Sequence, residues 1–475
     1  MHQKLNGVHK RYLFFVCFIA ALGGFLFGFD TAVISGTLFF IVKQFHFSSL
    51  MEGWFVSSAL LGCIIGVAAT GKLTDLYGRK KMMLLAAALF FMSAIGCMLA
   101  TNAFFLIACR LMGGLGIGIA SMICPLYISE FSPPSFRGRM VALYQLAITI
   151  GIVAAYFSNA FLLNLSTQYT FSGWFHLIFV SDVWRAMIGM GLIPSFIFLI
   201  CLFAVPESPR WLLLKGHYKK ALFYLQKVNT KAVAEKEVQE IEESLQEENN
   251  KKSSIRELFS PVYRTALIIG LALPFFSQVS GINAIIYYGP SILDRAGFSI
   301  GHALSGQVTI GIVNVLFTFV AVTTVDKWGR KPLLFLGITG AVTALVVIGI
   351  LFKTGSTEGP WILIFILSFI ACFAFSFGPV CWIILGEIFP TAVRGQAMSL
   401  ATLSLWIANF FVGQMTPVML KSDAWGPAAT FWTFAVLCVP ALWMTWKLIP
   451  ETKGKTLEEI EHVWKTKKAR VIYEV

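Results

Sequence analysis

The chain has 475 residues, of which 57% are hydrophobic, 15% aromatic and only 13% charged. This composition is too apolar for the core and surface of a soluble protein, so it excludes an ordinary soluble domain and indicates a protein that crosses a lipid bilayer many times. The net charge of +13 does not indicate a nucleic-acid partner, because the basic residues are divided among short segments between apolar runs and form no basic face.

Twelve helix-length apolar segments follow one another along the chain. They cover residues 12–40, 51–71, 82–102, 104–129, 139–164, 186–205, 262–293, 303–325, 332–353, 360–386, 392–420 and 427–448. Between the sixth and seventh segments the composition becomes charged and helix-favouring. The sequence therefore predicts an all-α membrane protein with an N-terminal six-helix bundle (1–205), a helical connector (206–261), a C-terminal six-helix bundle (262–448) and a tail (449–475).

The distribution of basic residues predicts the orientation of the chain. If the N-terminus is cytoplasmic, most of the 37 lysines and arginines fall in the inner segments, and the outer segments hold only Lys43, Arg185, Arg295, Lys353 and Lys421. Basic loops stay on the cytoplasmic side of a membrane. We therefore expect a multi-pass protein of the cell (inner) membrane with both termini and the connector in the cytoplasm.

The first predicted span contains Asp30 and the fourth contains Arg110. A charged side chain inside a bilayer is a functional hypothesis by default. Their depths from the outer end allow the two side chains to meet. A titrating carboxylate and a static ion pair that fixes two helices are both consistent with this spacing. Besides Asp30, we expect only Glu130 and Glu387 to be acids at or near the membrane.

The seventh span carries the stretch FFSQVSGINAIIYYGP at 275–290, in which Gln278 and Asn283 are polar. An unpaired amide in hydrocarbon is unfavourable by several kcal/mol, roughly. These side chains should therefore face a cavity, or else bond neighbouring helices to each other. The Ser280-Gly281 dipeptide and Pro290 can open the helix, and interrupted spans near the midplane are where transporters bind solutes.

The two halves of the chain repeat one another. TDLYGRKK at 74–81 matches VDKWGRKP at 325–332, and ISEFSPPSFRGRMVAL at 128–143 matches LGEIFPTAVRGQAMSL at 385–400. PESPRWL after the sixth span likewise matches PETKGKTL after the twelfth. Since six spans are an even number, both copies share one orientation, and a solute path should lie between them near the midplane.

These motifs, from GFLFGFDTAVISG at 24–36 to PETKGKTLEEIE at 450–461, resemble the sugar porter branch of the major facilitator superfamily, in particular its bacterial sugar–proton symporters of the xylose and hexose type. The resemblance implies two bundles that rock about a central sugar site, with a cytoplasmic helical connector, no cofactor, and function as a monomer. An acid at the place of Asp30 resembles the proton-coupled bacterial members. Protonation of Asp30 would then release Arg110 and change the balance between outward- and inward-facing states.

The resemblance also assigns a sugar site. Amides donate to and accept from sugar hydroxyls, and indole rings stack on the apolar faces of a pyranose. The residues carried over are Gln145, Gln278, Asn283, Asn314, Trp382 and Trp406. Tyr287 and Tyr288 could close over the site as an outer gate, although aromatic residues near an interface more often act as membrane anchors.

Three positions depart from the xylose-symporter pattern, namely Ser277, Ile152 and Leu405, each of which stands where that pattern has an amide. The expected site is therefore less polar. Ile152 is similar to the glucose facilitators and favours a hexose such as glucose, while a pentose such as xylose stays open.

Charged residues at the inner ends of the spans resemble the salt-bridge network that latches the inner gate in this family. Exposed ion pairs contribute only about 0 to 1 kcal/mol each, so a merely solvated charged face is the alternative. The residues of the expected network are Asp75, Arg79, Glu130, Arg137, Glu207, Asp326, Arg330, Glu387, Arg394 and Glu451.

The sequence thus favours import of a monosaccharide with protons by alternating access across the lipid bilayer. A facilitative uniporter is the nearest alternative, and a transporter-like sugar sensor is less favoured because only a short tail follows the last span. An enzyme is least favoured. The nine cysteines lie in apolar segments without a C-x-x-C pair, and we find no metal-binding cluster, phosphate loop or nucleophile–base pair.

Overall fold

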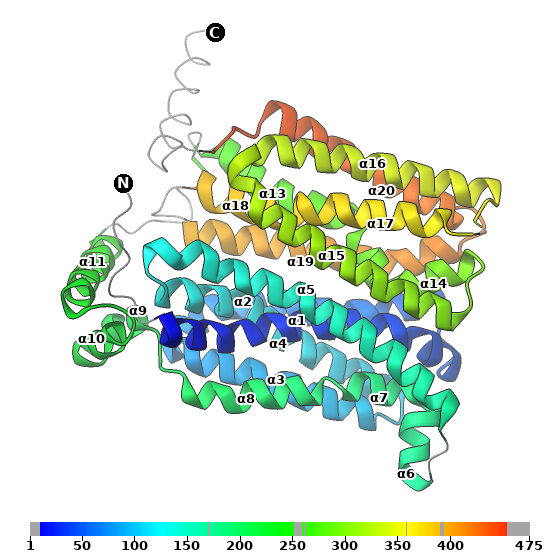
Figure 1. The fold of residues 1–475 in the computed structure, drawn as a ribbon, viewed down its shortest axis with the longest axis horizontal. Coiled ribbons are helices and arrows are strands. Elements are labelled where there is room, and N and C mark those ends of the chain that lie inside the picture. Colours follow the sequence, from blue (N-terminus) through cyan, green and yellow to red (C-terminus); the bar gives the residue numbers. More distant parts are fainter. Residues whose placement is uncertain are drawn as a thin grey trace.

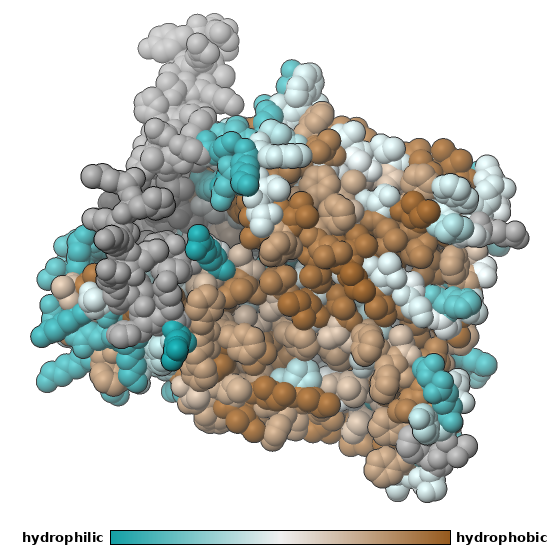
Figure 2. All heavy atoms as spheres, viewed as in Figure 1, coloured by the Kyte–Doolittle hydropathy of each residue, from teal (hydrophilic) through white to brown (hydrophobic). Residues whose placement is uncertain are grey.

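The computed structural model describes residues 10–169, 172–250, 259–260, 263–357, 359–389 and 394–453. These residues form helices and short turns, with no β-strand among them. Among the described residues, twelve helical segments are long and apolar enough to cross a membrane. This confirms the predicted all-α membrane fold. Figure 2 shows a broad hydrophobic surface across the middle of the face in view, with hydrophilic residues gathered toward the two ends.

The N-terminal bundle has six spans, the last of them divided in two. Its helices are α1 (Lys10–Gln44), α2 (Ser49–Tyr77), α3 (Arg79–Leu99), α4 (Ala103–Phe131), α5 (Pro134–Gln168), α7 (Val183–Gly189) and α8 (Leu192–Ala204). Between α5 and α7, the short α6 (Gly173–His176) and the π-helix η1 (Leu177–Ser181) project beyond the bundle (Figure 1).

The C-terminal bundle repeats this arrangement, but its first and fourth spans are divided. Its helices are α13 (Arg264–Val279), α14 (Ile282–Arg295), α15 (Ile300–Trp328), α16 (Arg330–Thr354), α17 (Trp361–Phe375), α18 (Phe377–Ile388), α19 (Arg394–Lys421) and α20 (Gly426–Lys447). The last helix of the N-terminal bundle ends at Ala204, and the C-terminal bundle runs from Arg264 to Lys447.

The connector contains α9 (Pro209–Leu214), α10 (Tyr218–Gln226) and α11 (Lys231–Asn250). These helices lie together at one end of the molecule (Figure 1) and have a small apolar core of their own. We call this end the connector end and the opposite one the far end. Its core residues are Leu212, Leu213, Ala221, Leu225, Ala234 and Val238.

The predicted break in the seventh span is present at Ser280-Gly281, between α13 and α14. Gly281 has φ +89°, a left-handed conformation that glycine adopts without a Cβ clash. A Cβ at this position would also lie 2.5 Å from a ring carbon of Phe434. Divisions at Ser376, between α17 and α18, and near Gly191, between α7 and α8, were not predicted.

The bundles meet along three pairs of helices, in which α2 packs against α19, α5 against α15, and α1 against α14. Within the N-terminal bundle α2 and α4 approach each other at glycines, where a Cβ on Gly62 would lie 2.2 Å from the Leu111 carbonyl oxygen. A Cβ on Gly114 would likewise lie 1.9 Å from the carbonyl oxygen of Ala59. Helices within the N-terminal bundle are therefore closely packed, and a different set of helix contacts joins the two bundles.

Candidate transport site

Asp30 of α1 and Arg110 of α4 form an ion pair. The predicted depths of the two residues in their spans allowed this contact. Arg110 Nη1 lies 3.0 Å from Asp30 Oδ2, and the side chains are 3% and 18% exposed, respectively. A charged group buried at membrane depth requires a counter-charge, since removing one partner leaves the other uncompensated. Loss of the Asp30 charge therefore changes the environment of Arg110 directly.

Asp30 also lines a small cavity of about 10 Å³ between α1, α3 and the α7–α8 division. This is close to the space that one water molecule requires. The other lining residues are apolar and include Phe29, Phe90, Ala94 and Gly191. The carboxylate thus pairs with Arg110, and the residue also borders this small cavity.

The two polar residues of the interrupted seventh span bond to each other across the break. Asn283 Nδ2 donates to Gln278 Oε1 at 2.5 Å, and Gln278 Nε2 donates to Ser277 Oγ at 3.1 Å. Gln278 is buried, while Asn283 is half-buried. These bonds connect the halves of one broken span rather than two neighbouring spans, so they do not support the alternative that the amides serve to join helices.

The remaining expected sugar contacts come from four helices. Gln145 on α5 and Trp382 on α18 are half-buried, and Asn314 on α15 is 9% exposed. Within the described part of the chain, the side chains of these three residues make no hydrogen bond. Trp406 on α19 is buried against Phe27 of α1, with ring centroids 5.4 Å apart. Phe27 lies in the other bundle and was not predicted from the sequence.

Tyr287 and Tyr288, the expected outer gate, are buried and bonded to α19. Asn409 Nδ2 donates to the Tyr287 hydroxyl at 3.0 Å, and the Tyr288 hydroxyl donates to the Gly413 carbonyl at 2.6 Å. The alternative that they are membrane anchors is wrong, because their rings are at most 2% exposed. Their bonds hold α14 against its own bundle.

A freed carbonyl in α14 is bound from the opposite bundle. Pro290 lies inside α14 and has no backbone N–H, so the carbonyl of Ile286, four residues earlier, loses its helical donor. The Tyr156 hydroxyl of α5 donates to this oxygen at 3.1 Å, and Gln307 Nε2 of α15 donates at 3.2 Å. Tyr156 therefore joins the N-terminal bundle to α14.

Replacing Tyr156 by Phe removes the only interbundle donor among these groups while keeping the ring. We expect the state in which α5 contacts α14 and the far ends of the bundles lie together to be destabilised by about 1 kcal/mol, the typical net value of one hydrogen bond. The population with the far ends apart should then rise about fivefold, measured as the distance between spin labels on the two bundles. An unchanged distance distribution would contradict the role given to this hydroxyl.

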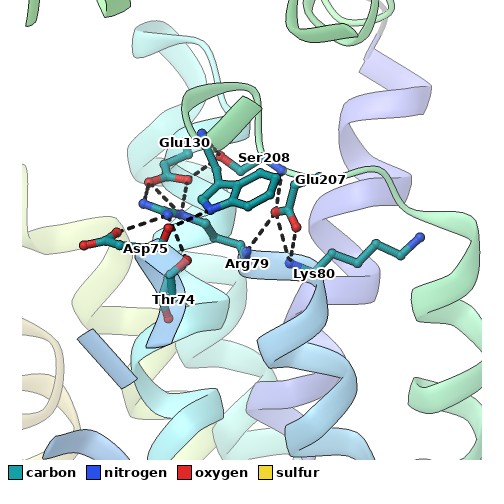
Figure 3. A network of polar contacts seen from close by, with 8 residues as sticks. Thr74, Asp75, Arg79, Lys80, Glu130, Glu207 and Ser208 are labelled. Atoms are coloured by element: carbon teal, nitrogen blue, oxygen red, sulfur yellow. Dashed lines mark hydrogen bonds and ion pairs between the residues drawn. The ribbon is translucent and has the colours of Figure 1, made fainter. Parts of the chain in front are cut away.

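Arg79 and Arg330 occupy equivalent places at the connector end of the two bundles (Figure 3 shows the Arg79 network). Arg79 Nη2 lies 2.9 Å from Glu130 Oε1, and Arg330 Nη2 lies 2.9 Å from Glu387 Oε1. Each arginine also binds the acid four residues before it. The internal repeat thus folds into a repeated charge network, with both arginines held within their own bundle.

Burial divides each network into strong and weak pairs. The side chains of Arg79 and Glu130 are only 7% and 6% exposed, whereas Asp75 and Asp326 are 67% and 80% exposed. The alternative of a merely solvated charged face is therefore wrong for Arg79 and Glu130, although it applies to the two aspartates.

Glu207 and Glu451 cap the starts of α3 and α16. Glu207 Oε1 accepts from the backbone N–H of Arg79 at 2.8 Å, and Glu451 Oε1 accepts from that of Arg330 at 3.1 Å. Burial raises the pKa of Glu207 despite its backbone donors. Burial also acts to raise the pKa of Glu451, but its backbone donors, first that of Lys453, outweigh burial and lower the pKa. The two caps are thus alike in geometry, but their pKa values are shifted in opposite directions.

Two expected members of the network lie apart from these arginines. Arg137 is exposed and donates through Nε to the carbonyl of Ser129 at 3.0 Å. Its positive charge also acts on Glu237 of the connector helix α11, where burial raises the pKa and Arg137 opposes that rise. The side chain of Arg394 lies outside the described residues.

Glu130→Gln should lower the free energy of unfolding by about 3 kcal/mol, because the buried Arg79 loses its compensating charge. Asp75→Asn, in the same network, should change it by less than about 1 kcal/mol, because that pair is exposed. Thermal and denaturant unfolding of the purified proteins in one detergent compares the two variants. Equal losses of unfolding free energy in the two variants would show that burial does not determine how much each ion pair contributes to stability.

Several residues around the site and between the bundles were missed. Glu52 lies in the second apolar segment but was not counted among the acids at the membrane, although it is 3% exposed on α2. It pairs with Lys421 of α19. A single acid at the first turn of an apolar run was the available signal, whereas Tyr156 and Asn409 gave none, because their partners are set by tertiary packing.

The chain matches the family model described as sugar (and other) transporter over residues 16–464. The chain belongs to this sugar transporter family. With its two bundles of membrane spans, it is a membrane transporter of the sugar porter type rather than an enzyme.

Two curated bacterial relatives cover nearly the whole chain. The arabinose-proton symporter of Bacillus subtilis (strain 168) is 42% identical over 445 residues, which covers 94% of this chain and 93% of the relative. The galactose-proton symporter of Escherichia coli (strain K12) is 38% identical over 476 residues, covering 99% and 98%. Among solved structures, a partially occluded inward-open conformation of the xylose transporter XylE from E. coli superposes with a TM-score of 0.82 at 35% identity, over 94% of this chain and 100% of that one.

Proposed function

We propose that this protein imports a monosaccharide together with protons by alternating access, with the connector end in the cytoplasm. The observation that carries the proposal is the buried Asp30–Arg110 pair in α1 and α4. No histidine lies in the middle of a span to take its place as a titrating group. The names of the arabinose and galactose relatives, both proton symporters, support the same coupling.

The proposed coupling follows from charge balance in a medium of low dielectric constant. Protonated Asp30 is neutral, so Arg110 loses its partner and the packing between α1 and α4 changes. One proton that crosses 100 mV contributes about 2.3 kcal/mol. This is enough for roughly 50-fold accumulation of a co-transported sugar, since every 1.4 kcal/mol is about tenfold.

Asp30→Asn should abolish sugar accumulation while leaving exchange of labelled for unlabelled sugar. The amide keeps the shape of the side chain but carries no titrating proton, so sugar can cross without coupling. Uptake into proteoliposomes with an imposed proton gradient measures the first property, and counterflow in the same vesicles measures the second and confirms folding. Accumulation by Asp30→Asn would rule Asp30 out as the coupling group.

A uniporter is separated from a symporter by following internal pH when sugar is added to wild-type vesicles. Sugar-dependent acidification is expected, because each sugar should bring a proton with it. Addition of a non-transported polyol provides the control. Sugar uptake without proton movement would establish uniport instead.

For the sugar we propose a hexose such as glucose, on the strength of Ile152. This residue is 6% exposed on α5, two turns after Gln145, and puts an apolar group where the xylose-symporter pattern has an amide. The sugars in the names of the relatives, arabinose, galactose and xylose, are the alternatives.

Competition of labelled glucose uptake by these four sugars tests the choice. The hexoses glucose and galactose should compete more strongly than the pentoses arabinose and xylose, because a less polar site satisfies fewer hydroxyls and gains more from the additional carbon of a hexose. Stronger competition by arabinose or xylose would assign the site to a pentose without affecting the proposed coupling.

A further inference from the structure

An ion pair joins the two bundles at the far end, between the first turn of α2 and the last turn of α19. Glu52 Oε2 lies against Lys421 Nζ, with the Glu52 side chain 4% exposed and the Lys421 side chain 37% exposed. It differs from the other buried ion pairs described above. Asp30–Arg110 and Arg79–Glu130 each lie within one bundle, whereas Glu52 and Lys421 belong to different bundles.

Further polar contacts surround this pair on the same two helices. Gln414 of α19 accepts a hydrogen bond from the Ser57 hydroxyl at 2.6 Å and donates to the Leu50 carbonyl at 3.0 Å, both on α2. The backbones approach closely at Gly53, where a Cβ would lie 2.3 Å from the Gln414 carbonyl oxygen. The Gln414 side chain therefore makes two polar contacts between α2 and α19, and Lys421 makes a third.

Separation of the far ends breaks all three contacts. A carboxylate that is 4% exposed depends on its partner for compensation, and here the partner moves away with the other bundle. In the open state both charged groups regain water, so the pair adds a moderate preference for closure rather than an irreversible lock. By contrast, pairs within one bundle are carried along unchanged when the bundles rock.

We propose that Glu52 and Lys421 form a far-end latch, a pair of positioning residues that favours the state in which the far end is closed. This inference rests on the proposed function only in that it requires alternating access. The latch sets the balance between the two states and contacts neither sugar nor proton. Its strength should therefore change the populations and the apparent affinity for sugar supplied at the far end, but leave proton coupling intact.

Distances between the bundles measure the latch directly. Spin labels at Phe104→Cys on α4 and Asp423→Cys after α19 report the separation at the far end, since both positions are exposed. Seven of the nine native cysteines are buried and the other two half-buried, which favours labelling of the introduced sites. The full-length protein is measured in lipid nanodiscs by pulsed electron paramagnetic resonance.

Glu52→Gln and Lys421→Met should each raise the ratio of open to closed far ends about tenfold, and the double variant should raise it no further than the stronger single one. Exchanging the charges, with Glu52→Lys and Lys421→Glu together, should restore closure. Lys353→Met, an exposed lysine at the same end of the same bundle, is the matched control and should change nothing.

Unchanged distances in both single variants, or additive effects in the double variant, would overturn the latch. Thermal unfolding of each variant distinguishes a shift of population from a folding defect. Uptake in the same variants keeps the two proposals separate. If the wild-type protein shows no sugar-dependent proton movement but Glu52→Gln opens as expected, symport is contradicted and the latch stands. Intact symport with unchanged distances contradicts the latch alone. Loss of proton movement in Glu52→Gln only would contradict the claim that the latch leaves coupling intact.

Discussion

A polar group inside a bilayer has no water to bond, and this constraint determines which side chains the core of the molecule can hold. Arg110 is tolerated because Asp30 lies 3.0 Å away. The Ile286 carbonyl, freed by Pro290, is tolerated because Tyr156 and Gln307 donate to it. Each compensating contact couples helices, so a change in one charge or one bond is transmitted to the packing of the spans.

The polar contacts fall into two groups with different consequences. Those around Arg79 and Arg330 connect helices of one bundle, which joins the helices of each bundle into one unit. Those of Tyr156, Gln414 and the Glu52–Lys421 pair cross from one bundle to the other. Rigid bundles with a reversible polar interface are what alternating access about a central site requires.

Much of the functional region could be predicted because it depends on local chemistry. Asp30 and Arg110 stood out as charges in apolar spans, Ser280-Gly281 as a helix break, and the two arginine networks as a repeat of the same motif. Other features could not be predicted. From the sequence, the rings of Tyr287 and Tyr288 could lie at the membrane interface or in the protein interior. Only their packing against α19 shows that they lie in the interior.

The sequence by itself determined the twelve spans, the duplication and the type of transporter, because hydrophobic length, charge and motif order are properties of the chain read one segment at a time. Only the tertiary structure decided which polar groups meet across the bundles. Glu52 and Lys421 are 369 residues apart, and Tyr156 and Ile286 are 130 apart. No local pattern specifies such pairs, since they follow from how two separately folded bundles dock.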